Sequence, residues 1–158
     1  MPNREEIETM FLAFHGRGWV AGAEEVEHDD GMWHIELEDE PWRFDDAYRR
    51  GNDWSCGHTK LFYEGELVLF MSYCGFYPKD VRTFLKETLR KQYEGLAFLG
   101  GRGPRTHRAN GLSYHNVLQA SDEFCVTGRE EIYRDSDHHL KLNELLGFHE
   151  YMVVVFPS

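Results

Sequence analysis

The chain has 158 residues and a net charge of −11, because 28 acidic residues outnumber 17 lysines and arginines. This length predicts one globular domain over residues 1–158, with a core that needs neither metal nor disulfide. The acidic total disfavours nucleic acids and membranes as partners, because both attract clustered positive charge. Apolar stretches such as 67–71 and 151–156 are too short to cross a membrane, and no apolar leader follows Met1. We therefore expect a cytoplasmic protein.

The three cysteines, Cys56, Cys74 and Cys125, lie far apart and include no C-x-x-C pair. An odd number of scattered cysteines argues against a disulfide framework and against a zinc ribbon. Each cysteine lies in an apolar strand context, where a buried and inert thiol is the usual state. We expect reduced cysteines, as in a cytoplasmic protein.

The first half of the chain predicts one helix followed by several strands. Apolar residues at helical spacing over 3–14 indicate a helix that begins with an Asn3/Glu6 capping box and ends at Gly16 or Gly18. Alternating apolar and polar residues then predict two half-buried strands, and a third short strand leads into an apolar one. These strands are expected at 33–38, 42–49, 61–63 and 67–74. The last is apolar on both faces and should be central in its sheet.

The second half predicts one more helix and more strands. Pro78 suits the first turn of a helix over 78–94, which has an apolar stripe and is followed by a Gly/Arg-rich loop over 100–111. Further strands are expected near 112–120, 124–126, 131–134, 140–146 and 151–156. This order lacks the βαβ alternation of a parallel sheet. We therefore predict an α+β fold: a curved, mainly antiparallel sheet with the N-terminal helix and a central helix packed on its concave face.

Two segments, 57–76 and 128–148, share a spacing of glycine and aromatic residues. Each reads as a strand, a polar turn and a second strand that contains Gly-Phe. Duplication of one hairpin and convergence on the same composition both explain the similarity.

Several motifs follow one another in a set order and spacing. They are Trp42-Arg43-Phe44-Asp45-Asp46-Ala47-Tyr48-Arg49-Arg50-Gly51, then Met71-Ser72-Tyr73-Cys74-Gly75, then Arg102-Gly103-Pro104, and finally Gly128-Arg129-Glu130-Glu131-Ile132. Together they resemble a family of small bacterial and archaeal domains of unknown function, some of which are attached to helix-turn-helix modules. The resemblance implies a shared fold. Because the function of that family is unassigned, it implies no catalytic or binding residue.

The stretch from Gly95 to Ser121 contains no acidic residue, so it carries +3 while the remaining chain carries −14. Arg102, Arg105 and Arg108 supply this charge, together with His107. Guanidinium groups and the N–H groups of a Gly-rich loop bind phosphate or carboxylate, although the P-loop spacing is absent. The alternative is a solvated loop whose arginines pair with an acidic surface.

A second group of candidates surrounds one carboxylate. Asp46 shares a strand face with Trp42 and Tyr48, and Tyr73 is expected to border the same region. A buried carboxylate among aromatic rings is a candidate for anchoring a ligand or for acid–base chemistry. The alternative is an aspartate that faces solvent or caps the following turn. In the same way, the aromatic side chains would line a cavity or fill a core.

Metal and nucleophilic chemistry have weaker support. His138 and His139 adjoin Asp135 and Asp137, but neighbouring residues on a strand point to opposite faces, so a polar hairpin tip is the favoured interpretation. No G-x-S-x-G motif is present. We expect no metal and no cofactor.

These observations support two hypotheses of function. The first is a non-enzymatic or regulatory module that binds a small anionic or aromatic ligand, with candidate contacts at Trp42, Asp46, Tyr48, Tyr73, Arg102, Arg105, His107 and Arg108. The alternative is a small hydrolase or lyase in which Asp46 and a tyrosine such as Tyr48 or Tyr114 move protons and an arginine stabilises negative charge. A homodimer formed through 151–156 is a weaker expectation, since an internal central strand would also explain that segment.

Overall fold

The computed structural model describes residues 1–135 and 144–156. Its helices are α1 (Arg4–Arg17) and α2 (Arg82–Glu94). The 3-10 turn η1 (Trp19–Ala21) follows α1, and the 3-10 turn η2 (Lys79–Val81) precedes α2. The strands are β1 (Val26–Glu27), β2 (Trp33–Asp39), β3 (Trp42–Gly51), β4 (Trp54–Tyr63), β5 (Glu66–Phe76), β6 (Thr106–Ala109), β7 (Leu112–Ser121), β8 (Cys125–Arg134) and β9 (Glu144–Val155). All neighbouring strands pair antiparallel in one open sheet of order β1-β2-β3-β4-β5-β9-β8-β7-β6.

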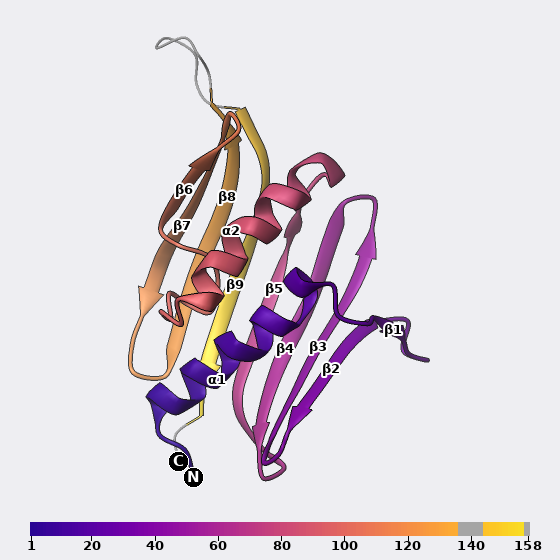
Figure 1. Ribbon diagram of the computed structural model, residues 1–158, viewed down its shortest axis with the longest axis vertical. Coiled ribbons are helices and arrows are strands. Elements are labelled where there is room, and N and C mark those ends of the chain that lie inside the picture. Colours follow the sequence, from indigo (N-terminus) through magenta and orange to yellow (C-terminus); the bar gives the residue numbers. More distant parts are fainter. Residues whose placement is uncertain (136–143, 157–158) are drawn as a thin grey trace.

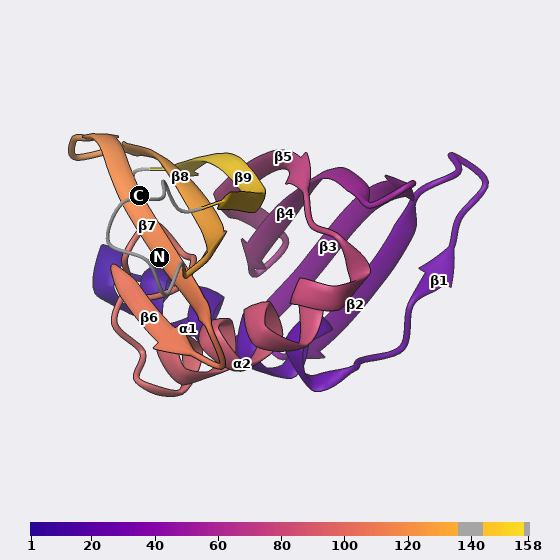
Figure 2. The same cartoon turned by 90° about the horizontal axis from the view of Figure 1, so that it is seen from above.

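Both helices lie against one face of this sheet (Figure 1), and the sheet curves over them (Figure 2). Two clusters of buried apolar side chains fill the space between the layers, one centred on α1 with β5 and β9 and one on α2. The predicted α+β fold, with a curved antiparallel sheet, an N-terminal helix and a central helix, is therefore confirmed. Within the described residues, neither helix is long and apolar enough to cross a membrane.

The helix boundaries follow from local hydrogen bonds. The capping box is present: the Asn3 side chain accepts from the Glu6 N–H at 3.0 Å, and the Glu6 carboxylate accepts from the Asn3 N–H at 2.8 Å. At the other end, Gly18 donates to the carbonyl of His15. The second helix begins four residues later than predicted, because the Val81 N–H bonds to the Pro78 carbonyl and closes a 3-10 turn first.

Residues with a left-handed backbone conformation form the hairpin turns. Asn52 and Asp53 both have positive φ, as do Glu64 with Gly65, and Asn110 with Gly111. Such residue pairs match the right-handed twist of the strands that they join. The last pair corrects one prediction: residues 106–109 are strand β6, not part of a loop, and Asn-Gly was the signal for that hairpin.

The middle of the sheet is formed by β5 and β9, which pair with each other from Leu69↔Val155 to Phe76↔Phe148. The prediction that 67–74 is a central strand is thus confirmed. The segment 151–156 lies mostly in β9, between β5 and β8, so pairing within the chain accounts for its apolar character. The two hairpins of similar composition, β4–β5 and β8–β9, lie side by side across this central pair.

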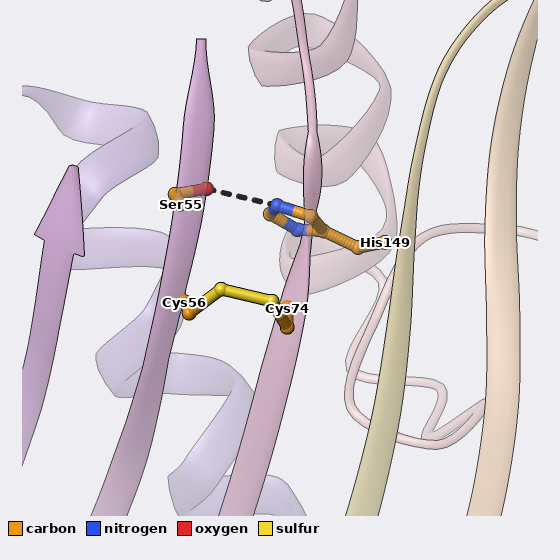
Figure 3. Close-up of a disulfide and its surroundings, with 4 residues drawn as sticks. All are labelled: Ser55, Cys56, Cys74 and His149. Atoms are coloured by element: carbon orange, nitrogen blue, oxygen red, sulfur yellow. Dashed lines mark hydrogen bonds between the residues drawn. A yellow bond between two sulfur atoms is a disulfide. The ribbon is translucent and has the colours of Figure 1, made fainter. Parts of the chain in front are cut away.

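The cysteine prediction is wrong for two of the three residues. Cys56 and Cys74 occupy directly opposed positions on β4 and β5, and a disulfide joins them on the outer face of the sheet (Figure 3). Both disulfide-bonded cysteines are exposed rather than buried. Cys125 is a free, half-buried thiol. Their separation of 18 residues hides this contact in the sequence, because only the hairpin register brings the two Cβ atoms together.

Candidate ligand-binding cavity

A cavity of about 730 Å³ lies between the helices and the inner face of the sheet. Its walls come from α1, η1, β3, β4, β5, β9, α2 and the loop that carries Arg102. Exposed residues such as Trp54, Lys79 and Thr83 are part of the lining, so the cavity opens to solvent at that end. The other end is buried and contains His15, Asp46, Arg102 and His149.

Asp46 occupies the buried end of the cavity. One oxygen, Oδ1, accepts a hydrogen bond from the Thr59 hydroxyl at 2.8 Å and another from the Tyr73 hydroxyl at 2.9 Å. The carboxyl is nevertheless almost fully removed from water, and this burial raises the pKa of Asp46 to about 6. A carboxyl with such a pKa changes charge close to neutral pH and responds to whatever occupies the cavity.

We expect the Asp46→Asn substitution to stabilise the protein at pH 8 by about 2–3 kcal/mol, since one pKa unit corresponds to about 1.4 kcal/mol. The folded-state pKa is raised above its usual value of 3.8, so ionisation of Asp46 destabilises the folded protein. The free energy of unfolding therefore falls as the pH rises from about 4 to about 6, and the loss is complete above that range. Urea unfolding at pH 8 and pH 4 checks this: the gain should be present at pH 8 and vanish at pH 4. Asp29→Asn, at an exposed position, is the control. A gain of equal size at both pH values would contradict the prediction.

Arg102 and Glu130 form a buried ion pair beside Asp46. Nε and Nη2 of Arg102 both donate to Oε1 of Glu130, the former at 3.2 Å, and the Tyr114 hydroxyl donates to Oε2 at 2.5 Å. The Arg102 guanidinium holds the pKa of Glu130 at about 2 in spite of its complete burial. The only cavity-lining arginine on the Gly/Arg-rich segment is therefore neutralised by its own partner.

Four buried polar atoms of the cavity lining have no hydrogen-bond partner within the described part of the chain. They are Nε2 of His15, Nδ1 of His149 and the hydroxyls of Tyr48 and Tyr77. Burial lowers the pKa of His15 to about 3, so its imidazole is neutral. Burial likewise raises the pKa of both phenols, which keep their protons. A buried polar atom without a partner costs free energy, so these groups are poised for a ligand or water.

His149 reaches the cavity from β9 and contacts two other polar groups. Its Nε2 lies 2.9 Å from the Ser55 hydroxyl, and its Nδ1 lies 3.6 Å from Oε1 of Glu130 (Figure 3 shows the contact with Ser55). Burial lowers the pKa of His149 below its usual value of 6.5. The imidazole is therefore neutral at pH 7 and can accept a proton.

Charges near the open end are largely paired. Arg50 donates to Glu25 at 2.8 Å and Arg82 donates to Asp53 at 2.8 Å. The ammonium of Lys86 lies 4.4 Å from the centre of the Trp19 ring. The entrance thus combines aromatic surface with paired charges of both signs and has no excess of one charge.

The structure brings four of the predicted candidates together: Asp46, Tyr48, Tyr73 and Arg102 all line the cavity. The other four lie elsewhere. Trp42 packs against Tyr63 with ring centres 4.9 Å apart, and His107 stacks on Phe84 at 5.7 Å. Arg105 and Arg108 are exposed on and beside β6, outside the cavity lining.

Several residues of the cavity were not among the sequence candidates. His15, Ser55, Tyr77 and His149 line it, and Glu130 lies behind it. The sequence contained one signal for two of them. Tyr77 and His149 each follow a Gly-Phe pair, and both glycines mark places where a side chain of the neighbouring strand crosses the backbone.

A separate group of potential metal ligands lies on the outer face of the sheet. Ligand atoms of His34, Glu36 and Asp45 lie within 4.8 Å of one another, the one such group among the described residues. His34 Nδ1 and Asp45 Oδ1 already share a hydrogen bond at 2.9 Å. This group faces away from the cavity, because Asp45 and Asp46 alternate along β3. His138 and His139 lie outside the described residues.

No family model, curated protein or solved structure matches this chain. The chemistry of the cavity is divided: aromatic rings and ion pairs lie near the entrance, whereas the buried end presents one carboxyl and several unpaired donors and acceptors.

Proposed function

We propose that this protein binds a small organic ligand in the cavity, and that the ligand has an aromatic part and an uncharged end rich in hydrogen-bonding groups. The observation that supports this most strongly is the set of unpaired buried atoms on His15, Tyr48 and Tyr77. Their burial without partners costs free energy, and ligand groups at hydrogen-bonding distance would remove that cost. Residues that lower stability and line a cavity are typical of binding sites.

The charges favour an uncharged ligand over the anion considered from the sequence. Glu130 already neutralises Arg102, and Asp46 adds a partial negative charge at neutral pH. An anion placed near Asp46 would meet like charge without a free guanidinium to offset it. A neutral donor such as an N–H or O–H group instead suits the Asp46 carboxylate.

The size of the cavity fits the same class of ligand. A volume of about 730 Å³ lies within the range of roughly 300–1,000 Å³ that is usual for small-molecule sites. Trp19 and Trp54 lie at the entrance and Tyr93 lines the interior, so flat rings can pack on several walls.

A neutral aromatic amine, 1-aminoanthracene, tests the proposal, because its fluorescence rises in apolar surroundings and its N–H groups can donate to Asp46. We expect saturable binding to the wild-type protein. Thr83→Trp should weaken it at least tenfold by filling the entrance, because Thr83 is an exposed lining residue. Glu87→Trp, one helical turn further along α2 and outside the lining, should leave the affinity unchanged. Equal affinities for both variants, or no saturable binding to the wild type, would refute a ligand site here.

A further inference from the structure

We propose that the cavity hydrolyses esters, with Ser55 as nucleophile, His149 as general base and Glu130 as the residue that positions His149. This inference rests on the proposed function, because the ester must first bind in the cavity. It goes beyond that function by naming the substrate class, a carboxylic ester with an aromatic part, and the reaction.

The three residues lie in one row across the sheet. Strand pairing places Ser55 opposite Gly75, Gly75 opposite His149, and His149 opposite Glu130. The Ser55 hydroxyl lies 2.9 Å from His149 Nε2, and His149 Nδ1 lies 3.6 Å from Glu130 Oε1. Nucleophile, base and carboxylate thus follow the order of a serine hydrolase triad. The contact between His149 and Glu130 is longer than a hydrogen bond and leaves Nδ1 without a partner among the described residues, and such catalytic contacts are often long before substrate binds.

Gly75 makes the first of these contacts sterically feasible. His149 extends from β9 over β5 to reach Ser55 on β4 (Figure 3). A Cβ atom at position 75 would lie 2.4 Å from His149 Cδ2, where no atom fits. Glycine at this position therefore leaves room for the imidazole between two strands that are not neighbours.

Each group has the protonation state that the reaction needs. The Arg102 guanidinium lowers the pKa of Glu130 to about 2, so Glu130 is a carboxylate at neutral pH. Burial and the positive charge of Arg102 lower the pKa of His149, while the Glu130 carboxylate opposes them, and the imidazole remains neutral. The other side chains around this ring, Tyr73 and Tyr77, are uncharged phenols.

The reaction balances with water as the second substrate. Oγ of Ser55 bonds to the ester carbonyl carbon while its proton moves to Nε2 of His149, and that proton then passes to the departing alcohol as the ester C–O bond breaks. Water next attacks the acyl group on Ser55 and gives a proton to His149. The bond to Oγ breaks, the carboxylic acid leaves, and the proton returns to Ser55.

The Tyr77 hydroxyl, an unpaired phenol beside His149, is the hydrogen-bond donor that we assign to the negative oxygen of the intermediate. The hydroxyls of Tyr48 and Tyr77 line the same cavity and lack partners in the described part of the chain. The Tyr77 ring lies against His149, with ring centres 4.7 Å apart. Donors that are already in place and shielded from water stabilise developing charge strongly.

Hydrolysis of p-nitrophenyl butyrate by the full chain tests the inference. We expect a rate above that of buffer, reduced at least 100-fold by Ser55→Ala and by His149→Gln. Ser121→Ala, at an exposed position at the end of β7, is the control and should retain the wild-type rate. A fluorophosphonate probe should label the wild-type protein, and peptide mass spectrometry should find the adduct on Ser55.

The pH profile tests the assignment of Glu130. The rate should fall on acidification with a midpoint below 6.5, as His149 becomes protonated. Glu130→Gln should move this midpoint to still lower pH, because the imidazolium loses the carboxylate that faces it. A purely structural Glu130 would lower the rate at every pH and leave the midpoint in place.

Failure of this inference is distinguishable from failure of ligand binding. If 1-aminoanthracene binds but the ester is not hydrolysed, or Ser55→Ala hydrolyses it at the wild-type rate, the catalytic assignment is wrong and the binding site stands. An adduct on any residue other than Ser55 also refutes it. If the wild-type protein does not bind the amine, the ligand site is itself refuted.

Discussion

Replacement of Arg102 by methionine should destabilise the protein by about 3–5 kcal/mol, the usual cost of removing one partner of a buried ion pair. Arg102 is 7% exposed and Glu130 is fully buried, so the remaining carboxylate would have no route to water. Tyr114 would still donate to Glu130, but a single phenol does not offset a buried charge. Urea denaturation at pH 7 measures the loss as a lower midpoint with an unchanged slope.

Two variants separate the ion pair from loss of a long side chain. Arg105→Met changes an exposed arginine on the same segment and should alter stability by less than about 0.5 kcal/mol. The double variant Arg102→Met with Glu130→Leu removes both charges and should recover part of the loss, because an apolar pair leaves no unpaired charge. A double variant less stable than Arg102→Met would contradict this account of the network.

The Arg102–Glu130 ion pair also makes the stability of the protein depend on pH. Glu130 has a folded-state pKa of about 2 against its usual 4.5, so its contribution to stability is complete above pH 4.5 and is lost as the pH falls toward 2. Asp46 acts in the opposite direction between about pH 4 and 6, because its pKa is raised. The Arg102→Met variant should therefore lose less stability than the wild type when both are acidified from pH 4.5 to 2.5.

Local patterns in the sequence were sufficient for most of the fold. Alternation in β2 and β3, the capping box at Asn3 and the apolar stripe of α2 all depend on near neighbours in the chain. Such patterns can be recognised without knowledge of tertiary contacts. The α+β class followed from the order of these elements.

The cavity required information that local patterns lack. Asp46 and Tyr48 were identified because a carboxyl among aromatic residues is visible within a short stretch, and Tyr73, on a later strand, was expected to border the same region. Ser55 and His149 were not, because they are 94 residues apart and meet only through the pairing of β4, β5 and β9. The disulfide was missed for the same reason.

Arg102 illustrates a further limit of the sequence. The acid-free segment 95–121 left two interpretations open, arginines that bind an anion and arginines that pair with acidic residues of the protein. For Arg102 the second holds, because its partner is Glu130 on β8. A segment can be free of acidic residues and still be neutralised, because strands distant in sequence supply the counter-charge. The net charge of a sequence segment therefore does not predict the charge around a residue of that segment in the folded protein.

Gly75→Ala should be the most damaging small substitution in the sheet, with a loss of about 3 kcal/mol or failure to fold. The added Cβ atom would lie 2.0 Å from the carbonyl oxygen of Phe148 and 2.7 Å from Cα of His149. Both are backbone atoms of β9, the central partner of β5, so a side-chain rotation cannot relieve the overlap. Thermal unfolding followed by circular dichroism measures the expected loss.

Gly51→Ala is the matched control, since the same Cβ atom at the end of β3 would have no atom within 4 Å and the φ angle is not left-handed. It should change stability by less than about 0.5 kcal/mol. The comparison isolates the close approach of β5 and β9 from the general effect of adding a methyl group to a strand. Because the same approach lets His149 reach Ser55, any folded Gly75→Ala protein should also lose that hydrogen bond. Equal stability of Gly75→Ala and Gly51→Ala would mean that β5 and β9 are further apart than the structure places them.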